Sequence, residues 1–128
     1  MTSPAGPALV VDEVRDHLAG HALLAGVLEV TELDLAPNLH PPSVVVGPPT
    51  MRASTPAGTD GPVLHRLTVY VVVQEDEGAY RSLLDLTQLV VRVLDEPAGI
   101  TIPEWRPTTF PSGAVELPAY AIDIEVTA

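Results

Sequence analysis

The stretch that decides the fold reads LHRLTVYVVV at residues 64–73, passes through the acidic turn EDEG at residues 75–78, and continues as AYRSLLDLTQLVVRVL at residues 79–94. In its first part the residues at every second position, from His65 to Val73, lie on one face and are mostly apolar, which is typical of a strand with one packed face. Its last part repeats apolar residues at helical spacing. The sequence therefore predicts a long strand that leads through a short turn into a long helix, from Ala79 to about Leu94.

The C-terminal region adds two further extended segments. From Tyr120 to Thr127 apolar and polar residues alternate strictly, so one side of this strand is expected to pack while Asp123 and Glu125 lie on the open side. Residues from Ile100 to Phe110 are also extended, but they include two prolines, which lack the N–H group that a central strand needs. This segment is predicted to be an edge strand or an irregular one.

The N-terminal half predicts shorter elements. A helix is expected from about Ala8 to Ala22, followed by strands at Val27–Leu33 and Ser43–Val46. From Pro48 to Pro62 the chain is rich in Pro, Gly, Thr and Ser and has no periodicity. We expect a long loop there, either a mobile loop that orders against a partner or plain disorder.

Together these elements predict a single α+β domain over residues 1–128, with a flexible start at residues 1–7. The sheet is expected to be antiparallel or mixed, with four to five strands, and to carry both helices on one face.

The composition narrows the function classes. The net charge is −11, and all six basic residues are arginine, which argues against binding to a phosphate backbone. The chain has no cysteine, so disulfides and thiolate chemistry are excluded. No apolar run approaches the roughly 20 residues of a membrane span, and the N-terminus lacks a signal-peptide pattern. We expect a protein that stays in the cytoplasm, at least until assembly.

The helix predicted at residues 79–94 is apolar over more of its surface than one sheet requires. At about 100° per residue its apolar side chains form an arc of roughly 220°, whereas a helix on a sheet needs little more than about 100°. The N-terminal helix covers the excess, or Leu86, Leu89 and Val93 meet a neighbouring subunit, or both hold at once, since a subunit interface is often an extension of the core. Trp105, between two prolines, is either a lid on the core or an interface residue.

The candidate catalytic and metal-binding residues do not form a recognised constellation. His17 and His21 are four apart on the first helix, a spacing that can bind zinc, but Leu18 stands where the metalloprotease motif has glutamate. The acidic turn at residues 75–77 lacks the ligand spacing of a calcium loop. No nucleophile elbow, phosphate loop or dinucleotide fingerprint is present. We therefore expect no enzyme activity, no cofactor and no bound metal.

With its elements in order, the chain resembles the tail terminator proteins (also called tail completion or minor tail proteins) of long-tailed bacteriophages. The resemblance rests on VVDEVRDHL at residues 10–18, RLTVYVVV at 66–73, YRSLLDLTQLV at 80–90, IPEWRP at 102–107 and AYAIDIEV at 119–126. It covers nearly the whole chain by pattern and size.

The resemblance implies a structural virion protein that forms a homohexameric ring. Such a ring caps the tail tube, ends its polymerisation and joins the tail to the head connector, after assembly in the host cytoplasm. The expected partners are further copies of the chain, the tube protein and the connector or neck proteins. Leu86, Leu89, Val93 and Trp105 would lie at the subunit boundary. Asp123 and Glu125 would line a channel through which DNA passes without specific binding, since like charges repel.

Two other functions fit the same pattern. One is a neck or head–tail connector protein of similar size. The other, from a different class, is a small cytoplasmic α+β domain that binds a ligand or a partner protein.

Overall fold

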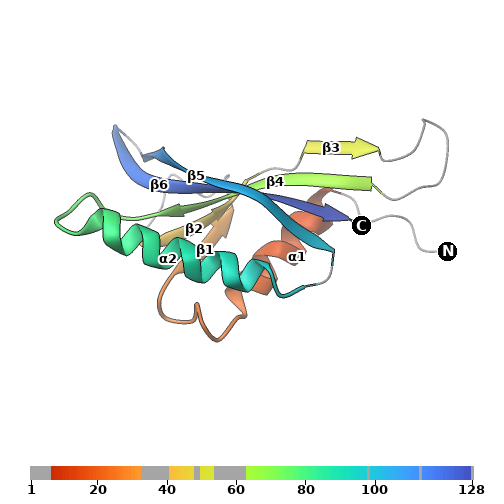
Figure 1. The fold of residues 1–128 in the computed structure, drawn as a ribbon, viewed down its shortest axis with the longest axis horizontal. Coiled ribbons are helices and arrows are strands. Elements are labelled where there is room, and N and C mark those ends of the chain that lie inside the picture. The colour runs from red at the N-terminus through yellow and green to blue at the C-terminus, as the bar shows by residue number, and fades with distance from the viewer. Residues whose placement is uncertain are drawn as a thin grey trace.

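The computed structural model of the chain describes residues 7–32, 41–47, 50–53, 63–97, 99–112 and 114–127. Two helices and six strands follow one another in these described residues (Figure 1): α1 (Pro7–Ala19), β1 (Glu29–Glu32), β2 (Ser43–Val46), β3 (Thr50–Ala53), β4 (Val63–Val72), α2 (Ala79–Leu94), β5 (Ile100–Ser112) and β6 (Val115–Thr127). The predicted α+β class is confirmed. The expected flexible start lies outside the described residues, except for Pro7, which begins α1.

The sheet is mixed, and its strands follow the order β1-β2-β4-β6-β5. β1 and β2 are parallel, and the remaining neighbours are antiparallel. β4 and β6 form the centre, paired from Leu64↔Thr127 to Val72↔Ala119. β3 pairs with the first half of β4, beyond the end of β2. The loop expected at residues 48–62 therefore contains a short strand, and the rest of it lies outside the described residues.

Both helices lie on one face of the sheet (Figure 1) and enclose the main core with it. α1 packs on β1 and β2, whereas α2 packs on β4, β6 and β5. Each fully buried aliphatic side chain adds about 1.5–3 kcal/mol to folding. The centre of this core is made by residues that are no more than 2% exposed: Val10, Val14, Leu18, Val44, Val69, Val71, Val90, Val93, Leu94, Ile122 and Ile124.

The opposite face of the sheet is divided into an apolar part and a polar part. A second, smaller cluster there consists of Val45, Val72, Phe110, Leu117 and Ala119. The ring of Tyr70 packs against this cluster, with its centroid 5.3 Å from that of Phe110. The remaining part of this face carries charged side chains.

α1 ends three residues before the predicted end, at Ala19 rather than Ala22. Gly20 follows directly, and a turn held by the backbone bonds Leu24 N–H to His21 O and Leu28 N–H to Leu24 O leads toward β1. Gly26 takes a positive φ of 73° in this turn, a conformation that glycine adopts without steric cost.

β5 is an edge strand, as the two prolines predicted. Among the described strands its one neighbour is β6, and its register shifts between Thr101 and Glu104. Proline fits an antiparallel pair where its nitrogen faces away from the neighbouring strand. The backbone nitrogens of Pro107 and Pro111 therefore face outward, away from β6, and carry no hydrogen. Along a regular strand the backbone nitrogens of Trp105 and Thr109 face the same way.

Candidate functional site

A shallow apolar groove runs between α2 and the edge strand β5. Its volume is about 240 Å³, and its lining residues are Leu84, Thr87, Gln88, Val91, Trp105 and Tyr120. Trp105 is opposite Ile122 in the register of β5 and β6, and cross-strand partners share a face of the sheet, so the indole lies on the helix side. It is 50% exposed, and Tyr80 and Leu84 on the facing helix are 65% and 39% exposed. The fold leaves this part of the apolar surface uncovered.

Two hydroxyl groups lie at the floor and rim of the groove. Thr87 is only 3% exposed, and its Oγ1 has no hydrogen-bond partner in the described part of the chain. Burial raises the pKa of Tyr120, and the neighbouring Tyr80 hydroxyl raises it further. Both groups can hydrogen-bond to an occupant of the groove.

Two arginines border the groove on its solvent side. Counting about 100° per residue from Tyr80, Leu84 lies at about 40°, whereas Arg81 and Arg92 lie at about 100° and 120°. Both arginines are exposed. Arg15, Arg66 and Arg106 have carboxylate partners, but within the described chain Arg81 and Arg92 have none. On the same count the exposed Asp95 and Asp85 lie at about 60° and 140°. The side of α2 next to the apolar stripe therefore carries two arginines without an ion pair in the described chain, together with two aspartates.

The subunit-interface residues predicted from the sequence occupy different environments. Trp105 is half exposed, as an interface residue would be. Leu86 and Leu89 are partly buried and pack against the main core. Val93 is 0% exposed, so its side chain has no surface to offer a neighbouring subunit. The exposed end of the apolar arc is instead made by Tyr80 and Leu84, which lie nearest the edge strand.

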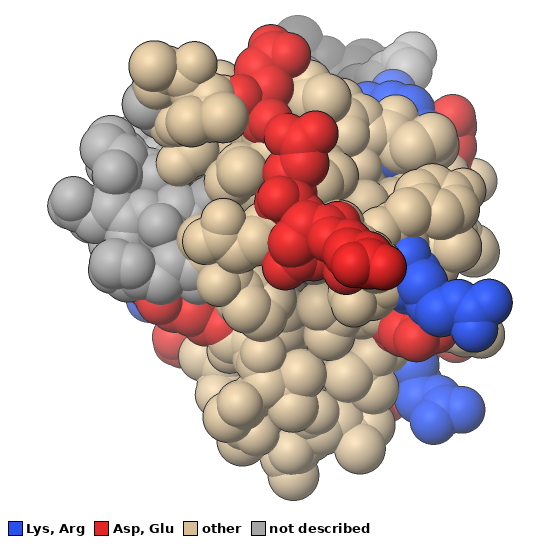
Figure 2. Space-filling model, turned by 90° about the vertical axis from the view of Figure 1, so that its left-hand side faces the viewer, with Lys and Arg blue, Asp and Glu red and all other residues tan. Residues whose placement is uncertain are grey.

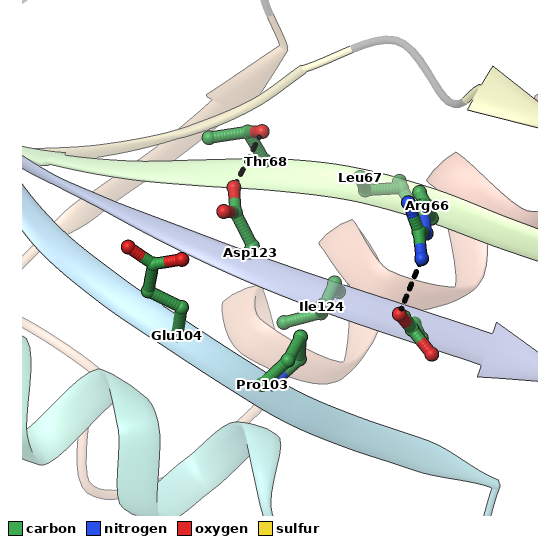
Figure 3. A pocket seen from close by; sticks show the side chains of 8 residues that line it. Arg66, Leu67, Thr68, Pro103, Glu104, Asp123 and Ile124 are labelled. Atoms are coloured by element: carbon green, nitrogen blue, oxygen red, sulfur yellow. Dashed lines mark hydrogen bonds and ion pairs between the residues drawn. The ribbon is translucent and has the colours of Figure 1, made fainter.

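The polar part of the far face contains a hollow of about 480 Å³, shown in Figure 3. It lies over β4 and β6 beside the register shift of β5, where Pro103 and Glu104 form its third side. Arg66 pairs with Glu125 at 3.1 Å. Thr68 donates a hydrogen bond of 3.1 Å to Asp123, and Arg106 donates to the other oxygen of that carboxylate.

Asp123 and Glu125, which were expected to face a channel, therefore lie on the open face but already have cationic partners. Hydrogen bonding to Asp123 and its charge raise the pKa of Arg106, which keeps that guanidinium charged. The hollow as a whole holds nearly balanced charge, since Arg66 and Arg106 face Glu104, Asp123 and Glu125. The repulsion that these two acids were expected to supply is largely compensated.

His17 and His21 connect the two helices. His17 Nε2 lies 2.8 Å from the carbonyl oxygen of Val93, one of the last carbonyls of α2, and must donate to it. His21 Nδ1 accepts the N–H of Leu23, so its Nε2 donates to the carboxylate of Glu96 at 2.8 Å. The nitrogens that would bind zinc are thus engaged in holding α1 to the end of α2. Within the described chain no three metal-ligating side chains come together.

The end of the molecule that precedes α2 is acidic. Figure 2 shows acidic side chains in a continuous band down the middle of this end, with arginines to one side. The exposed residues Glu75, Asp76 and Glu77 form the turn there, which is joined to β6 by the bond from Val73 N–H to Pro118 O. Val115, 56% exposed, and the exposed Glu116 lie at the same end, where β5 turns into β6 (Figure 1).

Neither helix in the described chain has the length and apolar character needed to cross a membrane. Comparison of the chain with known protein families and with curated proteins gives no match. The fold and these surfaces are therefore the features that bear on function.

Proposed function

We propose that this chain is a structural virion subunit of the tail-terminator kind, which associates with copies of itself into a closed ring. The ring caps the tail tube at its head-proximal end, stops its growth and offers a surface to the head connector. Its partners are then further copies of the chain, the tube protein and the connector. The resemblance in element order suggests this role, and the surfaces of the domain supply the physical support.

The observation that carries the proposal is the uncovered apolar groove between α2 and β5. A domain of this size can cover its helices fully, yet Tyr80, Leu84 and Trp105 stay between 39% and 65% exposed on adjoining elements. Aromatic residues in such positions are enriched at the centres of protein–protein interfaces. We expect a neighbouring subunit to bury this apolar surface, which is exposed in the single chain.

The electrostatics fit a ring through which DNA passes. Because the chain carries a net charge of −11, six copies would present a strongly negative assembly that does not hold a phosphate backbone. Asp123 and Glu125 add little to this repulsion, since both are paired with arginine. In this proposal the net charge of the whole ring, rather than two residues, keeps DNA from binding.

Native mass spectrometry of the purified chain over a range of concentrations tests the proposal. The expected result is one discrete multiple of the subunit mass, sixfold for a hexamer, with a central channel in negative-stain electron micrographs. A chain that remains monomeric at every concentration would contradict self-assembly into a ring.

The hollow over β4 and β6 gives specific support to a second candidate, the binding of a small polar ligand. Its volume of about 480 Å³ falls within the range of ligand pockets. Its arginines, however, are already paired with carboxylates, so an anionic ligand would have to displace them. A monomer whose melting temperature rises with a polar ligand would favour this candidate over the ring.

A further inference from the structure

We infer that the groove between α2 and β5 is a socket for the acidic end of a second copy of this chain. The inference rests on the proposed function and deepens it, because it names the two unlike surfaces that meet. It also places the subunit contact near Leu84, whereas the sequence predicted it at Leu86, Leu89 and Val93, toward the other end of the apolar arc.

The socket combines an apolar floor with free positive charge. Leu84, Val91 and Trp105 supply the floor, and Arg81 and Arg92 stand on its solvent side. The two arginines are eleven positions apart, which corresponds to about 16 Å along a helix. Asp85 and Asp95 lie on the same side of α2, but neither forms an ion pair with these arginines in the described chain. Both guanidinium groups are therefore available to carboxylates of an occupant.

The acidic end has the complementary composition. Val115 is 56% exposed where β5 turns into β6, and the exposed Glu116 follows it. The turn before α2, which contains the exposed Glu75, Asp76 and Glu77, lies at the same end of the molecule (Figure 1), and Figure 2 shows acidic side chains on this end. An apolar tip with acidic side chains around it matches an apolar floor with basic side chains beside it. In the part of the chain that the structure describes, no arginine pairs with residues 75–77.

A buried hydroxyl points to the same use of the groove. Thr87 Oγ1 lines the groove at 3% exposure and has no partner among the described residues. A buried hydroxyl without a partner destabilises the protein, because it has lost its hydrogen bonds to water and gained none in return. An occupant that brings a backbone carbonyl or a carboxylate to Thr87 removes this cost, whereas a purely apolar lid would not.

The two surfaces differ, so their contact is head-to-tail. Such a contact repeats from one subunit to the next, and it produces a closed ring if the rotation closes and an open chain if it does not. The contact therefore supplies the geometry that a ring requires, which a contact between two identical surfaces does not.

Charge reversal on each surface, followed by mixing, tests the inference. One variant carries Arg81→Glu and Arg92→Glu, and the other carries Glu75→Arg and Glu77→Arg. All four positions are exposed, so circular dichroism should show both variants folded. Each variant alone is expected to associate at least tenfold more weakly than the natural chain, by roughly the effect of like charges in an interface. An equimolar mixture should restore assemblies in which the variants alternate.

A double variant with Glu13→Arg and Glu29→Arg serves as the matched control, because it makes the same change in net charge as Glu75→Arg with Glu77→Arg, at exposed positions on α1 and β1. It should assemble like the natural chain. Rings that survive both reversals would overturn the contact and leave the proposed function standing. Failure of the mixture to assemble would overturn the pairing of these two surfaces.

The natural chain itself separates the two proposals. Dimers or open chains that show the same dependence on charge would keep the contact and contradict the ring. A natural chain that is monomeric throughout would contradict both the contact and the ring.

Discussion

The buried imidazole of His65 permits a quantitative test of the core, through the substitution His65→Leu. The ring is 0% exposed on the helix-covered face of β4, and neither nitrogen has a hydrogen-bond partner within the described chain. Its partner on β6 is Val126, and the next residue on the same face of β4 is Leu67. Leucine has a similar volume and no polar atom, so it suits these surroundings better.

The expected gain follows from the two ring nitrogens. A neutral imidazole carries one donor and one acceptor, and each buried group without a partner costs about 1–3 kcal/mol. Their removal should stabilise the fold by about 2–6 kcal/mol, from which the different shape of leucine subtracts about 1–3 kcal/mol. The midpoints of the two ranges, about 4 and about 2 kcal/mol, give an expected net increase in the free energy of unfolding of about 2 kcal/mol. In a domain of this size each kcal/mol raises the melting temperature by about 3–5 °C.

Urea unfolding at neutral pH, followed by circular dichroism, measures this difference. Val71→Leu is the matched control: Val71 lies on the same face of β4, is 0% exposed and has no polar atom to lose, so enlarging it should cost about 1–3 kcal/mol. A loss of stability in His65→Leu as large as that of the control would refute the reasoning. It would mean that the imidazole has a hydrogen-bond partner in the folded protein.

Three further predictions concern the helices and the groove. His17→Ala should lower the free energy of unfolding by about 1 kcal/mol, because Val93 O loses the imidazole donor and keeps the longer bond of 3.3 Å from Glu96 N–H, and stoichiometric zinc should leave the melting temperature of the natural chain unchanged in thermal unfolding. Gly78→Ala should cost about 1–2 kcal/mol in urea unfolding, because Gly78 precedes α2 with a φ of 82°, a left-handed conformation that alanine adopts only with strain; Gly78→Asn should cost less. In an ultraviolet titration, Tyr80→Phe should lower the raised pKa of Tyr120, whose contribution to stability is complete below about pH 10 and is lost as the pH rises through the folded-state pKa; an unchanged titration would contradict the contact between the two hydroxyl groups.

The sequence predicted the elements whose periodicity is long and strict. α2 begins and ends where its helical spacing placed it, and β4 agrees to within two residues. β2 also has its predicted bounds, but there the signal was a short apolar run that Gly47 ends, not an alternation. β6 begins at Val115, five residues before the predicted start, because Pro118 interrupts the alternation without ending the pairing with β5. β3 escaped prediction because four residues inside a Pro- and Gly-rich segment are too few to show a period. Its pairing depends on β4, which is distant in sequence.

The candidate site was predicted only in outline. The helical pattern identified an apolar arc wider than a sheet requires, and that excess is real. A helical wheel gives the angle of each side chain but not the positions of the sheet and of α1 around it. Val93 and Leu84 lie at opposite ends of the arc, and only the packing of α2 beside the edge strand shows that the first is covered and the second is not. The arginine partners of Asp123 and Glu125 come from other strands, so the spacing of the two acids could not reveal them.

The prolines of β5 limit the association of further chains through the edge of the sheet. A bare sheet edge accepts any strand by backbone hydrogen bonding, and each added strand presents a new edge, so such growth has no natural end. Pro107 and Pro111 withhold donors on the outer side of β5, beside the groove. Backbone pairing along this edge is therefore interrupted at every second outward-facing position, and recognition on this side of the molecule relies on side chains, which fix an angle between neighbours. A protein that has to be made in many copies can thus keep an adhesive surface without becoming a template for fibrils.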